Sequence, residues 1–99
     1  MNWKETSDTL GQIKKLAEAG LIKWTKLPFK NDDGSEITTA MGYHGEVTDW
    51  SFTVARFTVP ETGEIGFDGA ATNPRRGLVL HLPREMCKFL AEQAEEKTK

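Results

Sequence analysis

One alternating stretch, residues 47–59, constrains the fold of this chain most. Apolar and polar residues alternate along it, and aromatic and β-branched side chains dominate. That pattern is typical of a long strand with one buried face. The remaining segments are shorter and are bounded by turn residues, so we expect them to form further strands and helices that cover this strand.

The alternation changes phase within the stretch. Its apolar side chains are Trp50, Phe52, Val54, Phe57 and Val59. The first three share one parity and the last two have the other, which requires either two buried faces or one inserted residue. We expect a bulge at Ala55–Arg56, because a bulge would direct all five side chains into one core.

Helices are predicted at both ends of the chain. Asn2 and Glu5 form a capping box ahead of a helix over residues 3–19, and Gly20 supplies the left-handed residue that ends it. Pro83 suits the first turn of the second helix. The predicted apolar stripes comprise Trp3, Leu10, Ile13, Leu16 and Ala17 in the first helix, and Met86, Phe89, Leu90 and Ala94 in the second.

Shorter strands are predicted at residues 21–29, 36–43, 64–67 and 77–82. Pro28 makes the first of them an edge strand. We interpret His44-Gly45 as a tight connection into the central strand and residues 68–76 as an irregular loop. The hairpin-length connections predict one α+β domain over residues 1–99, in the order α-β-β-β-β-β-α. Its antiparallel sheet of four to five strands is flanked by the N-terminal and C-terminal helices.

The composition indicates the cellular compartment in which the protein is expected. Cys87 is the single cysteine, which excludes an intramolecular disulfide and a zinc-finger framework and fits a reducing compartment. No apolar run approaches the ~20 residues that span a bilayer. The first residues lack the apolar core of a signal peptide. We therefore expect a cytoplasmic protein that does not bind membranes.

The charge distribution is more informative than the net charge of −2. Arg56 is the only Lys or Arg in residues 31–69, whereas the segments on either side are net positive. The acids of that middle segment are Asp32, Asp33, Glu36, Glu46, Asp49, Glu61, Glu64 and Asp68. Because such a surface favours a basic partner, we expect Asp32, Asp33, Glu61 and Glu64, in two hairpin turns, to bind another protein.

A catalytic interpretation has weaker support. His44, Glu46, Arg56 and His81 are the residue types that metal-free RNA cleavage uses for acid–base catalysis and phosphate binding. Small guanyl ribonucleases are also α+β domains, but no motif at fixed spacing links this chain to them, so the comparison rests on fold class alone. Positions in a turn, at a strand start and near a helix start explain His44, Glu46 and His81 better, and we do not expect an enzyme.

Metal and cofactor motifs are incomplete. His44-Gly45-Glu46 matches half of the zinc deaminase signature, but the cysteine pair of the other half is missing. Residues 32–36 lack the spacing of a calcium-binding EF-hand loop. The glycines of residues 63–69 follow a turn and do not join a strand to a helix, so the dinucleotide fingerprint fails. We expect neither a metal nor a cofactor.

A second binding candidate is the loop that contains Arg75 and Arg76, which suits a phosphate or a carboxylate. The basic-Gly-aliphatic run of residues 76–80, followed by Pro83 and a helix, resembles the end of the positive-cofactor family of single-stranded-DNA-binding transcriptional coactivators. The resemblance implies a single-stranded nucleic-acid-binding domain. For this alternative, the residue types select Arg75, Arg76 and Arg56 as phosphate contacts and sheet aromatics such as Trp24 or Trp50 as stacking surfaces for bases. The acidic middle of this chain departs from that family's basic groove.

Three classes of function therefore remain. The sequence favours a small non-catalytic accessory, adaptor or inhibitor protein that binds a protein partner. A single-stranded nucleic-acid-binding domain is the alternative, and a small metal-independent ribonuclease is the third. A homodimer formed through exposed apolar sheet area also stays open.

Overall fold

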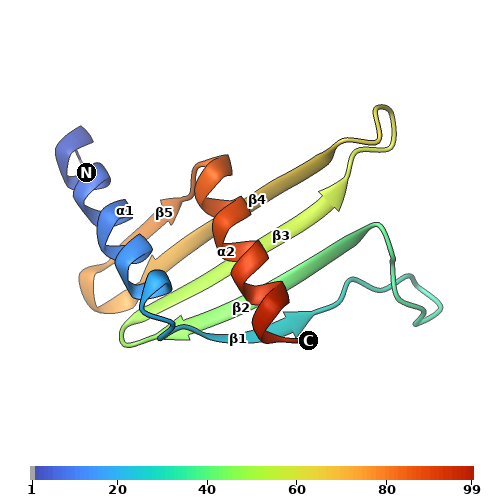
Figure 1. Cartoon of the computed structure of the whole chain (residues 1–99), viewed down its shortest axis with the longest axis horizontal. Coiled ribbons are helices and arrows are strands. Elements are labelled where there is room, and N and C mark those ends of the chain that lie inside the picture. Colours follow the sequence, from blue (N-terminus) through green and yellow to red (C-terminus); the bar gives the residue numbers. More distant parts are fainter. Residues whose placement is uncertain (1) are drawn as a thin grey trace.

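The computed structural model describes residues 2–99 and confirms the predicted α+β layout (Figure 1). The elements in chain order are α1 (Trp3–Glu18), β1 (Lys23–Leu27), β2 (Ala40–Val47), β3 (Trp50–Thr58), β4 (Ile65–Asn73), the 3₁₀ turn η1 (Pro74–Arg76), β5 (Leu78–His81) and α2 (Arg84–Lys97). The strands form one antiparallel sheet in the order β1-β2-β3-β4-β5. Both helices lie on the same face of the sheet, which we call the covered face; the other is the open face.

Helix α1 begins and ends as its sequence predicts. Asn2 accepts a hydrogen bond from the backbone N–H of Glu5 at 2.9 Å, and Gly20 has φ of 72° just after the helix. The position of Trp3 was predicted wrongly, because its side chain is 83% exposed. The buried line of α1 runs through Thr9, Ile13 and Ala17 at four-residue spacing, and Trp3 lies off this line.

Strand β2 differs from its predicted position. It runs from Ala40 to Val47, so His44 and Gly45 lie inside a strand, and the turn to β3 is Thr48–Asp49. Gly45 was predicted as a turn glycine, but packing explains it instead. A Cβ atom at this position would stand 2.7 Å from the Trp24 ring and 2.7 Å from Ile22, so only glycine lets these side chains cross the strand.

Strand β3 contains no bulge, and the prediction of one at Ala55–Arg56 was wrong. Its pairing with β4 is continuous from Ser51 to Thr58. The change of phase therefore means that apolar side chains occupy both faces of the strand. Trp50, Phe52 and Val54 are buried as predicted, whereas Phe57 lies on the open face and is half-buried. Val59 follows the end of the strand and is also half-buried.

Strand β4 is longer than predicted, because residues 68–73 continue it where an irregular loop was expected. Small side chains obscured the strand pattern, yet close packing requires them. A Cβ atom at Gly69 would stand 2.7 Å from a side-chain carbon of Val54, and Ala71 is fully buried. The strand ends at Asn73, where Pro74 begins the 3₁₀ turn.

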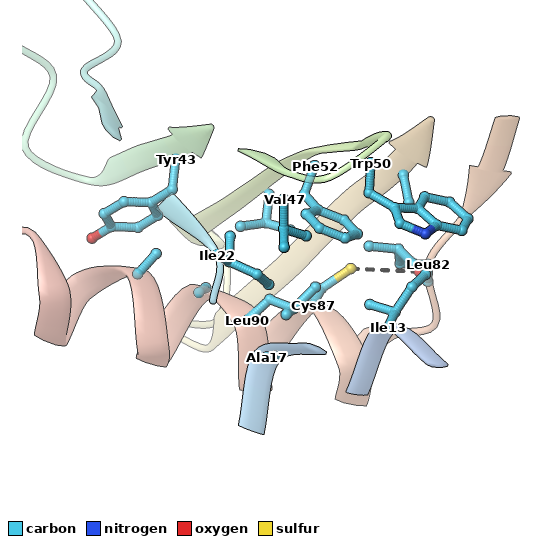
Figure 2. Packing of buried hydrophobic residues seen from close by; sticks show 14 residues of the cluster. Ile13, Ala17, Ile22, Tyr43, Val47, Trp50, Phe52, Leu82, Cys87 and Leu90 are labelled. Atoms are coloured by element: carbon cyan, nitrogen blue, oxygen red, sulfur yellow. Dashed lines mark hydrogen bonds between the residues drawn. The ribbon is translucent and has the colours of Figure 1, made fainter. Parts of the chain in front are cut away.

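The core lies between the covered face and the two helices. Figure 2 shows Ile13 of α1 with Cys87 and Leu90 of α2 close to Phe52 and Trp50 of the sheet. Helix α2 contacts β1, β2, β3 and β4, so it crosses most of the sheet. Its polar side chains also tie it to α1, because the side-chain amide of Gln93 donates to the carbonyl of Ala17 at 2.6 Å. Within residues 2–99, no helix has both the length and the apolar character needed to cross a bilayer.

The role of Gly45 can be tested with two glycine substitutions. Gly45→Ala places a methyl group against Trp24 and Ile22, so we expect a loss of about 1–3 kcal/mol in the free energy of unfolding, as for other overpacked cores. Gly11→Ala is the control. Gly11 lies in α1, and a Cβ atom added there would meet no neighbour within 4 Å, so alanine should stabilise the helix by about 1 kcal/mol. Urea denaturation measures both, and an unchanged midpoint for Gly45→Ala would contradict this packing.

Candidate functional site

The predicted acidic turns lie at the same end of the sheet (Figure 1). In an antiparallel meander, alternate connections return to the same end, so residues 28–39 and 59–64 lie there together. We call this the acidic end. Its carboxylates are Asp32, Asp33, Glu36, Glu61 and Glu64, and all five residues are exposed. Lys30 is the only Lys or Arg in these two connections, so their charge is strongly negative.

The first of the two connections is closed by its own hydrogen bonds. The backbone N–H of Gly34, which has φ of 87°, donates to the Asn31 carbonyl at 3.0 Å. The Asp33 carboxylate accepts from the Ser35 backbone N–H at 2.9 Å and from its hydroxyl at 2.6 Å. These bonds lower the pKa of Asp33 below its ordinary value, so the turn keeps its charge in mildly acidic conditions.

The second connection is a tight hairpin turn. The backbone N–H of Gly63, with φ of 73°, donates to the Val59 carbonyl at 2.8 Å, and Val59 N–H donates to the Glu64 carbonyl at 2.8 Å. Glu61 and Glu64 project from this turn. In the part of the chain that the structure describes, neither they nor Asp32 form an ion pair. These three carboxylates are therefore free to meet a partner.

Arg75 and Arg76 lie in η1 at the opposite end of the sheet. The guanidinium of Arg75 is 3.6 Å from the Asp49 carboxylate, and that of Arg76 stands over the Trp50 ring at 5.9 Å from its centroid. Asn73 caps this turn, because its side-chain oxygen accepts from the Arg76 backbone N–H at 3.3 Å. Both arginines remain exposed, but each already has a partner within the chain.

Arg56 is not brought together with these two arginines. Its side chain lies on the covered face, where Nε is 3.9 Å from the Glu95 carboxylate of α2. Tyr43 lies beside this pair; burial and the nearby Glu95 charge raise the pKa of the Tyr43 hydroxyl. Arg56 therefore lies between the sheet and α2, and the predicted three-arginine phosphate site is not assembled.

The histidines form two separate pairs on the open face. His44 Nε2 lies 3.1 Å from a Glu46 carboxylate oxygen, and His81 Nε2 lies 2.9 Å from a carboxylate oxygen of Asp68. The register places β3 and β4 between the two histidines, which at a strand spacing of about 4.8 Å separates them by about 14 Å. Arg56 lies on the other face, so the residues of the ribonuclease interpretation do not converge.

The pair of Asp68 and His81 was not predicted from the sequence, because the two residues lie on different strands and no short motif joins them. They border a shallow hollow of about 270 Å³ on the open face, which Thr53, Ala55 and Ala70 also line. The hydrogen bond from His81 lowers the pKa of Asp68 below its ordinary value. The Asp68 carboxylate and the His81 imidazole therefore lie together at one side of the hollow.

The structure also places the candidate metal ligands and the single cysteine. Across residues 2–99, no group of three or more His, Cys, Asp or Glu side chains is placed to hold a metal ion. Cys87 is fully buried, its thiol donates to the Leu82 carbonyl at 3.5 Å (Figure 2), and burial raises its pKa to about 11. Its place in the core makes it a structural residue.

Comparisons with family models, with curated proteins and with solved structures found no match to this chain.

The Asp68–His81 pair can be tested by carboxyl NMR. Replacement of His81 by alanine removes the hydrogen bond that lowers the pKa of Asp68, so this pKa should rise toward its ordinary value. The matched control is His44→Ala, which removes the other open-face histidine and should leave Asp68 unchanged. The side-chain carboxyl shift of Asp68, followed from neutral to acidic pH, measures the effect. An identical titration in His81→Ala would show that the pair does not form in solution.

Proposed function

We propose that this chain is a small non-catalytic binding module, a cytoplasmic accessory, adaptor or inhibitor protein that binds a basic protein partner. The observation that carries the proposal is the gathering of exposed carboxylates at the acidic end of the sheet, whose two connections contain Lys30 as their only Lys or Arg. The exposed arginines of η1 lie at the other end of the sheet. Arg84 of α2 reaches the Ile65 carbonyl beside the second connection, but its guanidinium is also paired with Glu85 at 3.0 Å. A surface of this kind attracts a basic partner and repels an acidic one.

The local structure of the acidic end supports a binding role. Both connections are closed by backbone hydrogen bonds and contain a glycine with positive φ, at Gly34 and Gly63. The strands that carry them form a continuous hydrogen-bonded sheet. Binding residues commonly lie on loops that a rigid scaffold holds in place, because such loops lose little conformational entropy on association. Carboxylates on ordered turns meet this requirement.

Single-stranded nucleic-acid binding has less support from the geometry. Arg56 lies beneath α2, Arg75 lies beside Asp49, and Arg76 stands over Trp50. Trp24 and Trp50 pack against Phe52 in the core and do not offer an exposed stacking surface. Nonspecific nucleic-acid binding needs a continuous basic footprint. The acidic end would repel a phosphate backbone.

The proposal is tested by neutralising the acidic end. A pull-down from the source cells with the wild-type chain identifies the partner, and isothermal titration measures its affinity. Asp32→Asn, Asp33→Asn, Glu61→Gln and Glu64→Gln combined should weaken this affinity by roughly tenfold or more at low salt, and added salt should weaken the wild-type complex. The control neutralises four exposed carboxylates elsewhere, Asp8, Glu18, Glu92 and Glu96, and should change the affinity little.

Two results would contradict the proposal. The first is a partner complex whose affinity is the same for the wild type and the acidic-end variant, which would make the acidic turns a solubility feature. The second is salt-sensitive binding of a fluorescent oligothymidine that is lost when Arg75 and Arg76 are replaced by alanine. That result would favour the nucleic-acid alternative.

A further inference from the structure

The open face carries an apolar patch at its acidic end. Pairing across the strands places Ala55 between Gly42 of β2 and Asp68 of β4, and Phe57 between Ala40 and Gly66. Leu27 of β1 pairs with Gly42 from the other side. We call this set the open-face patch; it consists of Leu27, Phe29, Ala40, Ala55 and Phe57.

Two glycines shape the patch. The ring of Phe57 occupies the space that a side chain at Gly66 would need, and the Phe29 ring comes within 3.5 Å of a Cβ atom placed on Gly42. Both rings therefore lie against bare backbone. Such aromatic–glycine pairs stabilise a sheet, but here they also leave apolar surface in solvent. Leu27 and Phe29 remain 44% and 43% exposed.

Neither helix covers this patch, because both helices lie on the covered face. The two acidic connections flank it, since Leu27 and Ala40 adjoin residues 28–39 and Phe57 adjoins residues 59–64. Asp68 adds a carboxylate on the same face, directly across from Ala55. An apolar centre with a charged rim is the arrangement of a protein-binding surface.

The negative charge of the rim indicates which kind of molecule binds to the patch. A second copy of the chain would present the same patch through a twofold axis, which would bring two acidic ends together. Like charges held at close range oppose such a dimer. An anionic membrane surface and a nucleic acid are disfavoured for the same reason. A polypeptide that carries both apolar and basic side chains complements both parts of the surface.

We propose that the open-face patch and its acidic rim bind an amphipathic basic segment of a partner protein. The apolar side chains of that segment pack on Leu27, Phe29 and Phe57, and its Lys or Arg side chains meet the acidic turns and Asp68. This inference rests on the proposed function and names the surface and the partner chemistry that the acidic end serves. The shallow hollow beside Ala55 and Asp68 offers room for one cationic side chain.

The test uses a fluorescent synthetic peptide of leucine and lysine with an apolar helical face, and measures its binding by anisotropy. Phe57→Ser should weaken binding about tenfold, because it removes an aromatic contact. Leu27→Ser with Phe29→Ser should have a similar effect, and both positions are exposed enough to be changed without loss of the fold. The control is Val79→Ser, which alters a 76% exposed open-face residue on β5 outside the patch. Circular dichroism confirms that each variant is folded.

The outcomes separate this inference from the proposed function. Loss of peptide binding in the patch variants and in the acidic-end variant, with Val79→Ser unchanged, supports the inference. Peptide binding that is lost in the acidic-end variant but is unchanged in both patch variants would overturn the inference, although it would still agree with the proposed function. If the acidic-end variant binds the peptide and the captured partner as tightly as the wild type does, both the inference and the proposed function are contradicted. A wild-type chain that sediments as a dimer, and as a monomer after Phe57→Ser, would assign the patch to self-association and overturn the inference.

Discussion

The packing of α2 across one face of the sheet is the interaction on which the rest of the structure depends. Leu90 and Cys87 of this helix are fully buried against side chains of the sheet, and the Gln93 side chain accepts a hydrogen bond from the Trp24 indole of β1 at 3.2 Å. On the covered face, Gly45 leaves room for the side chains of Trp24 and Ile22, and Gly69 leaves room for that of Val54. Because both helices lie on this face, the opposite face is left uncovered.

The sheet topology then determines at which end of the sheet the charged residues lie. A meander returns alternate connections to the same end, so the acidic turns gather at one end while η1 and its arginines lie at the other. Neither gathering depends on a long-range motif in the sequence. The position of each charged group follows from the order of the strands and from the residues that their turns contain. A surface on which one charge is concentrated acts mainly on the rate and selectivity of association.

Much of this fold could be predicted from local patterns. The helix N-cap at Asn2, the helix stop at Gly20 and the turns at Gly34 and Gly63 have local physical causes, and all of them are present. The errors occurred where packing overrides local preference. Gly45 resembled a turn residue, although the Trp24 ring requires it, and the small residues of β4 resembled a loop. The phase change before Phe57 suggested a bulge because one buried face was assumed.

The candidate site, like the fold, could be predicted from the sequence only in part. The charge of Asp32, Asp33, Glu61 and Glu64 is evident in the sequence, but their common location depends on strand order. The open-face patch depends on strand register, because Phe57 becomes a surface residue only when β3 runs without a bulge. Contacts such as that between Asp68 and His81 join distant parts of the chain, and no periodic pattern signals them.

Amide chemical-shift mapping of the complex with the captured partner tests the central claim most directly. The account predicts that the largest shifts fall in residues 27–40 and 55–66, at the acidic end and the open-face patch. Amides of α2 and of the η1 turn should change little. Shifts concentrated at residues 73–79, or along α2, would contradict the account, because they would place the partner on a surface far from the acidic end.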